Sequence, residues 1–149
     1  MTFYMNEAAF DLPDADITDG TVNELVFHAA DGASFSLTVH RQPIGPSETL
    51  ASLVAANLER AQRALSSHAV LFQREIEVAG VPGIELAVAW RGEQSMLYTR
   101  QVHLALHGAW LVFAGNAPLA ARAECDALLG RVLASFRPRT LPEARLVSS

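Results

Sequence analysis

Phe35-Ser36-Leu37-Thr38-Val39-His40 is a run in which apolar and polar side chains alternate at every position. Successive side chains of a β-strand point to opposite faces, so the three apolar residues share one face and the three polar residues share the other. A strand with a single apolar face is typical of a half-buried antiparallel sheet. This run therefore predicts a sheet that packs one face on a hydrophobic core.

The same period of two recurs further along the chain, from Val70 to Val78, from Ile84 to Trp90 and from Met96 to Leu106. With the first run these stretches make four strands, and the short turns between them predict an antiparallel meander. The expected turns contain glycine and lie at residues 79–83, 91–93 and 107–108. We expect earlier strands near residues 2–5, 9–12 and 22–27.

Two segments break the period of two and predict helices. From Ser47 to Leu65, apolar residues recur at intervals of three and four and leave the charged residues on the other face. From Pro118 to Ser135 a second apolar stripe includes Cys125, which we expect to pack in the core, with Asn116 as the N-terminal cap. We therefore expect one α+β domain over residues 1–140, an antiparallel sheet with a helix crossing between its early and late halves, and a flexible tail over residues 141–149.

Composition excludes several chemistries. The chain has 149 residues, 50% of them hydrophobic, a formal net charge of −5 and no lysine. A phosphate-binding lysine, a lysine Schiff base and a lysine general base are therefore absent, and scattered arginines on an acidic chain argue against nucleic acid as a partner. The N-terminus has neither a basic region nor an apolar core of the kind that directs secretion, so we expect a cytoplasmic protein without membrane insertion.

No combination of residues in the sequence predicts a catalytic or metal site. His103 and His107 lie in a predicted strand, where four residues span about 13 Å, too far for one ion. We expect these histidines on the surface or facing a partner, no metal and no cofactor, and a binding protein rather than an enzyme. A hydrolase or isomerase that uses the histidines or carboxylates remains the weaker alternative, because no base can be paired with a nucleophile.

One strand face combines apolar and hydrogen-bonding side chains without any charge: Leu97, Thr99, Gln101, His103 and Ala105. Such a face suits a polypeptide ligand, because apolar contacts give affinity while an amide side chain can bond to exposed backbone. An ordinary solvent-facing side of a sheet would have a similar composition, and both interpretations stay open from these residues alone.

Several short segments stand in a characteristic order over residues 1–140: Met1–Tyr4, Leu12–Asp14, Asp19–Asn23, Leu53–Glu59, Arg100–Val102 and Ser135–Pro138. Together they resemble the Eag chaperones of bacterial type VI secretion, which belong to the DcrB-like family with a PsbP-like fold. It implies a curved antiparallel sheet flanked by two main helices, in an α/β/α sandwich.

The resemblance also implies a function. A member of this family would be a cytoplasmic homodimer that binds the N-terminal transmembrane helices of a PAAR- or Rhs-containing effector until the effector is loaded on the secretion spike. Carried over to this sequence, the effector-binding residues would be Val22, Asn57, Leu65 and Gln101. Asn57 stands where glutamine is common in the family, and Glu24 stands where an apolar residue is expected. The alternative is a general protein-binding module of the same fold with a cell-envelope or regulatory partner.

Overall fold

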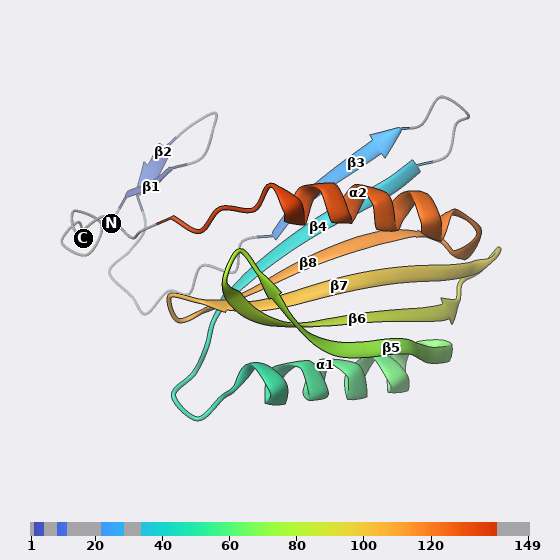
Figure 1. The fold of residues 1–149 in the computed structure, drawn as a ribbon, viewed down its shortest axis with the longest axis horizontal. Helices are drawn as coiled ribbons and strands as arrows, with labels where there is room; N and C mark the ends of the chain where they lie inside the picture. Colours follow the sequence, from blue (N-terminus) through green and yellow to red (C-terminus); the bar gives the residue numbers. More distant parts are fainter. Residues whose placement is uncertain (1, 5–8, 12–21, 29–33, 140–149) are drawn as a thin grey trace.

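A curved, six-stranded antiparallel sheet forms the centre of the protein (Figure 1). The computed structural model describes residues 2–4, 9–11, 22–28 and 34–139. The strand order is β3-β4-β8-β7-β6-β5, and the two short strands β1 (Thr2–Tyr4) and β2 (Ala9–Asp11) pair with each other. The six strands are β3 (Val22–His28), β4 (Ser34–Pro43), β5 (Ser66–Val78), β6 (Val81–Arg91), β7 (Met96–Leu106) and β8 (Ala109–Pro118).

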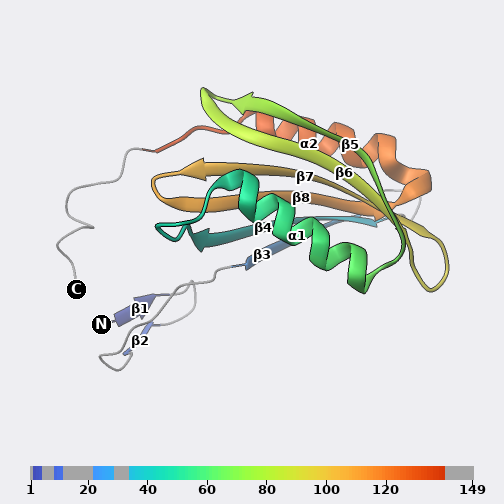
Figure 2. The same ribbon diagram turned by 90° about the horizontal axis from the view of Figure 1, so that it is seen from below.

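The two helices lie on opposite sides of this sheet, as Figures 1 and 2 show. Helix α1 (Leu50–Ala64) follows β4 and leads to β5 at the far edge of the sheet. Strands β5 to β8 then run back as an antiparallel meander, so β8 ends beside β4. Helix α2 (Arg122–Ala134) follows β8 after the short 3₁₀ helix η1 (Leu119–Ala121) and covers the other face. The expected crossover helix and the single α+β domain are confirmed.

Two-residue turns close two of the hairpins of the meander. Val78 pairs with Val81 across Ala79-Gly80, and Leu106 pairs with Ala109 across His107-Gly108. All four turn residues have φ between 50° and 80°. Turns with positive φ at both central positions match the right-handed twist of the flanking strands, so both hairpins bend sharply without splaying.

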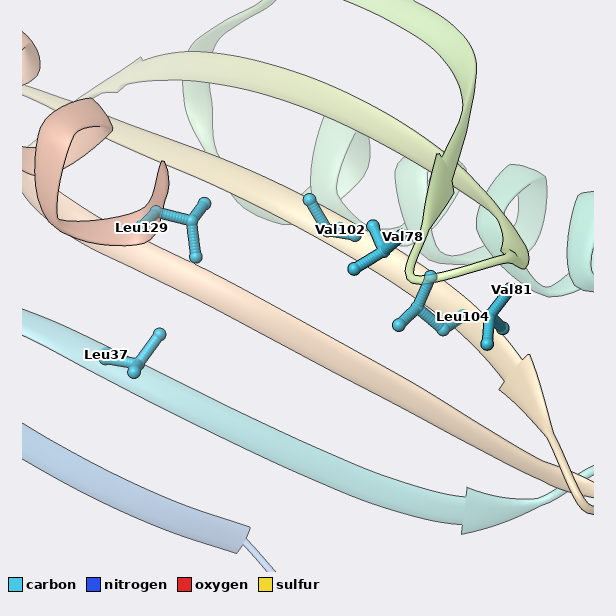
Figure 3. Close-up of a cluster of buried hydrophobic side chains, with 6 residues drawn as sticks. All are labelled: Leu37, Val78, Val81, Val102, Leu104 and Leu129. Atoms are coloured by element: carbon cyan, nitrogen blue, oxygen red, sulfur yellow. The ribbon is translucent and has the colours of Figure 1, made fainter. Parts of the chain in front are cut away.

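The core between the sheet and α2 is built from the apolar faces that the alternating pattern predicts. Figure 3 shows its main cluster, to which Leu37 comes from β4, Val102 and Leu104 from β7, and Leu129 from α2. Cys125 of α2 is buried in an adjoining cluster with Tyr98, which confirms its expected place in the core. A Cβ at Gly115 would lie 2.9 Å from the sulfur of Cys125, so this glycine allows α2 to approach β8 closely.

Charged groups also join α2 to the sheet. The carboxylate of Glu85, only 3% exposed, accepts hydrogen bonds from Nε of Arg74 (2.7 Å) and from Nη2 of Arg100 (2.7 Å). On α2, the carboxylate of Asp126 accepts a 2.6 Å hydrogen bond from the hydroxyl of Tyr98 and lies 3.7 Å from Nη1 of Arg100. Burial together with the Asp126 carboxylate raises the pKa of Tyr98. These contacts keep the Glu85 carboxylate paired in the interior, where an unpaired charge is costly.

Helix α1 packs against β5, β6 and β7 on the opposite face. Its N-terminus is held by a capping box, because the Thr49 side chain accepts a hydrogen bond from the backbone of Ser52 while the Ser52 side chain accepts one from the backbone of Thr49. Val54 of α1 is buried against Leu86 and Val88 of β6. The helix is therefore anchored over one half of the sheet.

Most predicted elements are confirmed, but strand β8 is not among those predicted, and the meander consists of β5 to β8 and does not include β4. Helix α1 begins at Leu50 instead of Ser47, since Thr49 is its cap. Helix α2 begins at Arg122 instead of Pro118, because β8 continues to Pro118, and Asn116 is not a helix cap but a residue of β8. The expected tail over residues 141–149 and the end of the domain at residue 140 lie outside the described residues. Neither described helix is long and apolar enough to cross a bilayer.

Candidate functional site

A cleft of about 340 Å³ lies between α1 and the face of the sheet that α2 does not cover. Figure 2 shows α1 lying along this face. Strands β4, β6, β7 and β8 supply its floor, and α1 and the start of β5 supply its wall. Along each of these strands the lining residues are alternate ones, because only every second side chain points to this face. The same period that places the core on one side of the sheet thus places the cleft on the other.

The floor of the cleft contains a network of neutral polar side chains around Asn116. Its Oδ1 accepts a hydrogen bond from the hydroxyl of Thr99 (3.1 Å). Its Nδ2 donates to the hydroxyl of Ser36 (3.1 Å), and lies 3.4 Å from the hydroxyl of Thr38. The three strands β4, β8 and β7 are therefore joined through side chains as well as through the backbone, and the orientation of the amide is fixed before any ligand arrives.

Beneath the cleft, His103 is fully buried at 0% exposed. The indole N–H of Trp110 donates to its Nδ1 (3.0 Å), and its Nε2 lies 2.8 Å from Oε1 of Gln101. Burial lowers the pKa of His103 to about 4, so the ring is neutral at pH 7. The expectation that His103 is on the surface or faces a partner is wrong, because Trp110 stacks beside the ring with 5.8 Å between their centroids. His107, in contrast, is exposed.

The lining of the cleft combines apolar and aromatic side chains with amides, hydroxyls and two histidines, and it carries little permanent charge. Among the described residues that line the cleft, Arg60 is the one with a permanently charged side chain, and its Nη2 lies 3.4 Å from Oδ1 of Asn57. The other wall and floor residues include Leu58, Leu65, Val88, Trp90, Trp110 and Val112. A pocket with apolar walls and a few oriented polar groups is the usual form of a binding site.

Three of the four predicted site residues meet in this cleft. Asn57 and Leu65 line it from α1 and its C-cap, and Gln101 lines it from β7. Val22 does not line the cleft, but it lies on edge strand β3 opposite His40, which does. Directly paired residues share a sheet face, so Val22, 55% exposed, extends the cleft face outward. Glu24 is opposite Thr38 and is exposed on this same face.

Two further residues of the site, Trp110 and Asn116, are not predicted from the sequence. Both belong to β8, which lies between β4 and β7 in the sheet. A period of two runs through Trp110, Val112, Ala114 and Asn116, and this signal could have placed them on one face. The hydrogen bond from Asn116 to Ser36, 80 residues away in the sequence, depends on the order of the strands, which local periodicity does not determine.

The geometry suits binding of a polypeptide segment that is apolar but carries some hydrogen-bonding groups. Neighbours hold the side chains of Thr99 and Asn116 and the carbonyl end of Gln101, and leucine, valine and tryptophan side chains provide apolar surface. Oriented neutral groups bind neutral partners without the cost of desolvating a charge. Cys125 cannot contribute to the cleft, because it is buried beneath α2 on the other face, where burial raises the pKa of its thiol to about 11.

Comparison with known proteins gives a family and a fold. Residues 7–135 match the family model described as DcrB. A crystal structure from Pseudomonas aeruginosa, PA94, described as a protein of unknown function and a candidate regulator, has a TM-score of 0.78 at 22% identity over 95% of this chain and 98% of its own. The solution structure of cyanobacterial PsbP (CyanoP) from Synechocystis sp. PCC 6803 has a TM-score of 0.58 at 12% identity over 79% of this chain and 82% of its own. No curated protein matches the chain. At these identities the two structures show the fold alone, which is similar to PsbP.

Proposed function

The chain belongs to the DcrB family, and from that premise we propose that it is an Eag-type chaperone of type VI secretion. It binds the N-terminal transmembrane helices of a PAAR- or Rhs-containing effector and keeps them in solution until the effector is loaded on the spike. In this role it is a cytoplasmic adaptor that acts as a homodimer, not an enzyme.

One observation carries the proposal. Asn57, Leu65 and Gln101, which the resemblance assigns to effector binding, come from α1 and β7 and line a single cleft. Their neighbours are apolar side chains, amides, hydroxyls and two histidines, and Arg60 is the one permanently charged side chain among the described lining residues. This is the surface that a transmembrane segment requires, because such a segment presents apolar side chains and only a few polar groups.

The physical reason for a chaperone is the cost of apolar surface in water. A helix that is meant for a membrane exposes its side chains to solvent before it is inserted, and this exposure drives aggregation. Leu65 and Val22 would cover part of that surface. Gln101 and Asn57 would form hydrogen bonds like those between helices inside a membrane.

A general protein-binding module is the alternative function, and an exposed apolar residue on edge strand β3 favours it. Leu25 is 52% exposed and lies opposite Leu37, on the face that α2 covers. An apolar contact there would use a surface distinct from the cleft. Variants on the cleft face and variants at Leu25 therefore separate the chaperone from the general binding module.

The test is co-expression, without detergent, of the tagged chain with the N-terminal apolar segment of the effector encoded beside it. We expect the segment to become soluble and to co-purify. The double variant Gln101→Ala, Val22→Asp should lower the amount recovered at least about tenfold, because it removes an amide and places a charge against apolar cargo.

The matched control is the double variant Gln73→Ala, Leu25→Asp. It removes an exposed amide of β5 that does not line the cleft, and it places the same charge on β3 at Leu25, on the opposite face of the sheet from the cleft. This control should retain the segment. Loss of the segment in the control alone would favour the general module. A segment that stays insoluble beside a folded chain would contradict the chaperone role.

A further inference from the structure

The hydrogen bonds below the cleft determine which end of the Gln101 amide faces a ligand. The indole N–H of a tryptophan can only donate, and that of Trp110 points at Nδ1 of His103, 3.0 Å away. Nδ1 must therefore accept and carries no proton. A neutral imidazole has one proton, so it is on Nε2.

The same reasoning extends from His103 to Gln101. The protonated Nε2 donates to Oε1 of Gln101, 2.8 Å away. Because the carbonyl end of the amide is used in this way, the NH₂ end is free to face the cleft that Gln101 lines. The opposite tautomer of His103 would accept from the NH₂ group and turn the carbonyl toward the ligand.

From this geometry we propose that Trp110 and His103 are positioning residues that hold the Gln101 amide with its NH₂ group toward the cleft, so that the site selects segments that present an accepting oxygen. The inference rests on the proposed function and adds the chemical character of the cargo contact. The accepting oxygen would be a hydroxyl or a carbonyl that the apolar helix does not use itself, as at a helix C-terminus.

The polar floor beside Gln101 supports this assignment. Thr99, two residues earlier on the same strand face, donates to Asn116, whose own NH₂ group is bonded to Ser36. The Asn116 amide is thus occupied at both ends by described residues, whereas the Gln101 amide is occupied only at its carbonyl end. Gln101 is therefore an amide of the floor whose carbonyl end is held in place while its NH₂ group remains available to the cargo.

The first test is made on the free chain. Long-range ¹H–¹⁵N NMR of the imidazole nitrogens, assigned with His103→Gln, should show a protonated Nε2 and an unprotonated Nδ1 in His103. Trp110→Phe keeps an aromatic ring but removes the donor, so the shifts of the two nitrogens should move toward each other. Trp90→Phe, which changes the other tryptophan of the cleft, should leave the tautomer unchanged.

The second test measures affinity for the N-terminal apolar segment of the effector. Trp110→Phe should weaken binding more than Trp90→Phe does, by about two- to tenfold, as expected for one neutral hydrogen bond. Gln101→Glu, which can accept from His103 but has no N–H to offer, should also weaken binding. This second variant keeps the proposal testable if Trp110→Phe does not fold.

The two tests separate failure of this inference from failure of the proposed function. A wild-type chain that has the expected tautomer but does not bind the segment would contradict the chaperone role alone. The positioning role is overturned if His103 carries its proton on Nδ1. It is also overturned if wild type binds the segment and Gln101→Glu binds it equally well or more tightly.

Discussion

A single buried histidine links the sheet to the cleft. His103 is enclosed under α1, and both of its ring nitrogens have partners, Trp110 on one side and Gln101 on the other. Burial disfavours its charged form, which lowers its pKa to about 4 from the ordinary 6.5. The residue that makes the cleft floor rigid therefore also makes the folded state sensitive to acid.

The expected effect of pH on stability follows from this lowered pKa. Between pH 6.5 and 4 the unfolded chain binds a proton at this position and the folded chain does not, so stability falls as the pH falls through this range. From pH 7.5 to pH 5 the contribution of His103 should lower the free energy of unfolding by about 2 kcal/mol. Urea unfolding at the two pH values measures it.

His103→Gln is the control for this experiment, because other groups titrate in the same range and act on both proteins. The variant should lose less stability than wild type between the two pH values, by that same amount. An equal loss in both proteins would mean that His103 is not held neutral in the fold.

At the scale of elements, alternation in the sequence predicts β4, β5, β6 and β7, and the spacing of three and four predicts the crossover helix. Strand β8 is missing from this prediction, since the proline and asparagine near its end resemble a helix start and predict Asn116 as a cap. In the structure, Asn116 pairs with Thr99 and Ser36 inside the sheet. Here the pairing of β8 with β4 and β7 overrides the local preference of these residues for a helix start.

The attachment of α2 to the sheet depends on a charge that is almost fully buried. Removing the Glu85 carboxylate would leave Arg100, itself 18% exposed, without its closest partner. Glu85→Ala should therefore destabilise the fold by about 3–5 kcal/mol, the cost of leaving one partner of a buried pair uncompensated. Urea unfolding at pH 7 measures this difference.

Glu59→Ala is the matched control for the buried carboxylate. Glu59 also bonds to an arginine, Arg63, but both side chains are about two-thirds exposed. This change should cost less than about 1 kcal/mol. Similar losses for the two variants would show that Glu85 is not held as the structure describes.

At the scale of the whole molecule, the cleft results from covering the two faces of one sheet unequally. Helix α2 packs along one face, whereas α1 packs against β5, β6 and β7 and leaves a hollow over β4 and β8. The resemblance supplied Asn57, Leu65 and Gln101 as binding residues. Sequence alone could not show that they meet, because the strand order β4-β8-β7 follows from long-range pairing.

The central claim is that this cleft holds the apolar segment of a secreted effector, and site-specific photo-cross-linking tests it most directly. A photoreactive amino acid replaces Leu65 in the cleft wall or, as the matched position, Leu71, an exposed leucine of β5 outside the lining. After co-expression with the effector segment and irradiation, we predict a covalent adduct from position 65 and little from position 71. Equal adducts at both positions, or an adduct from position 71 alone, would contradict the account.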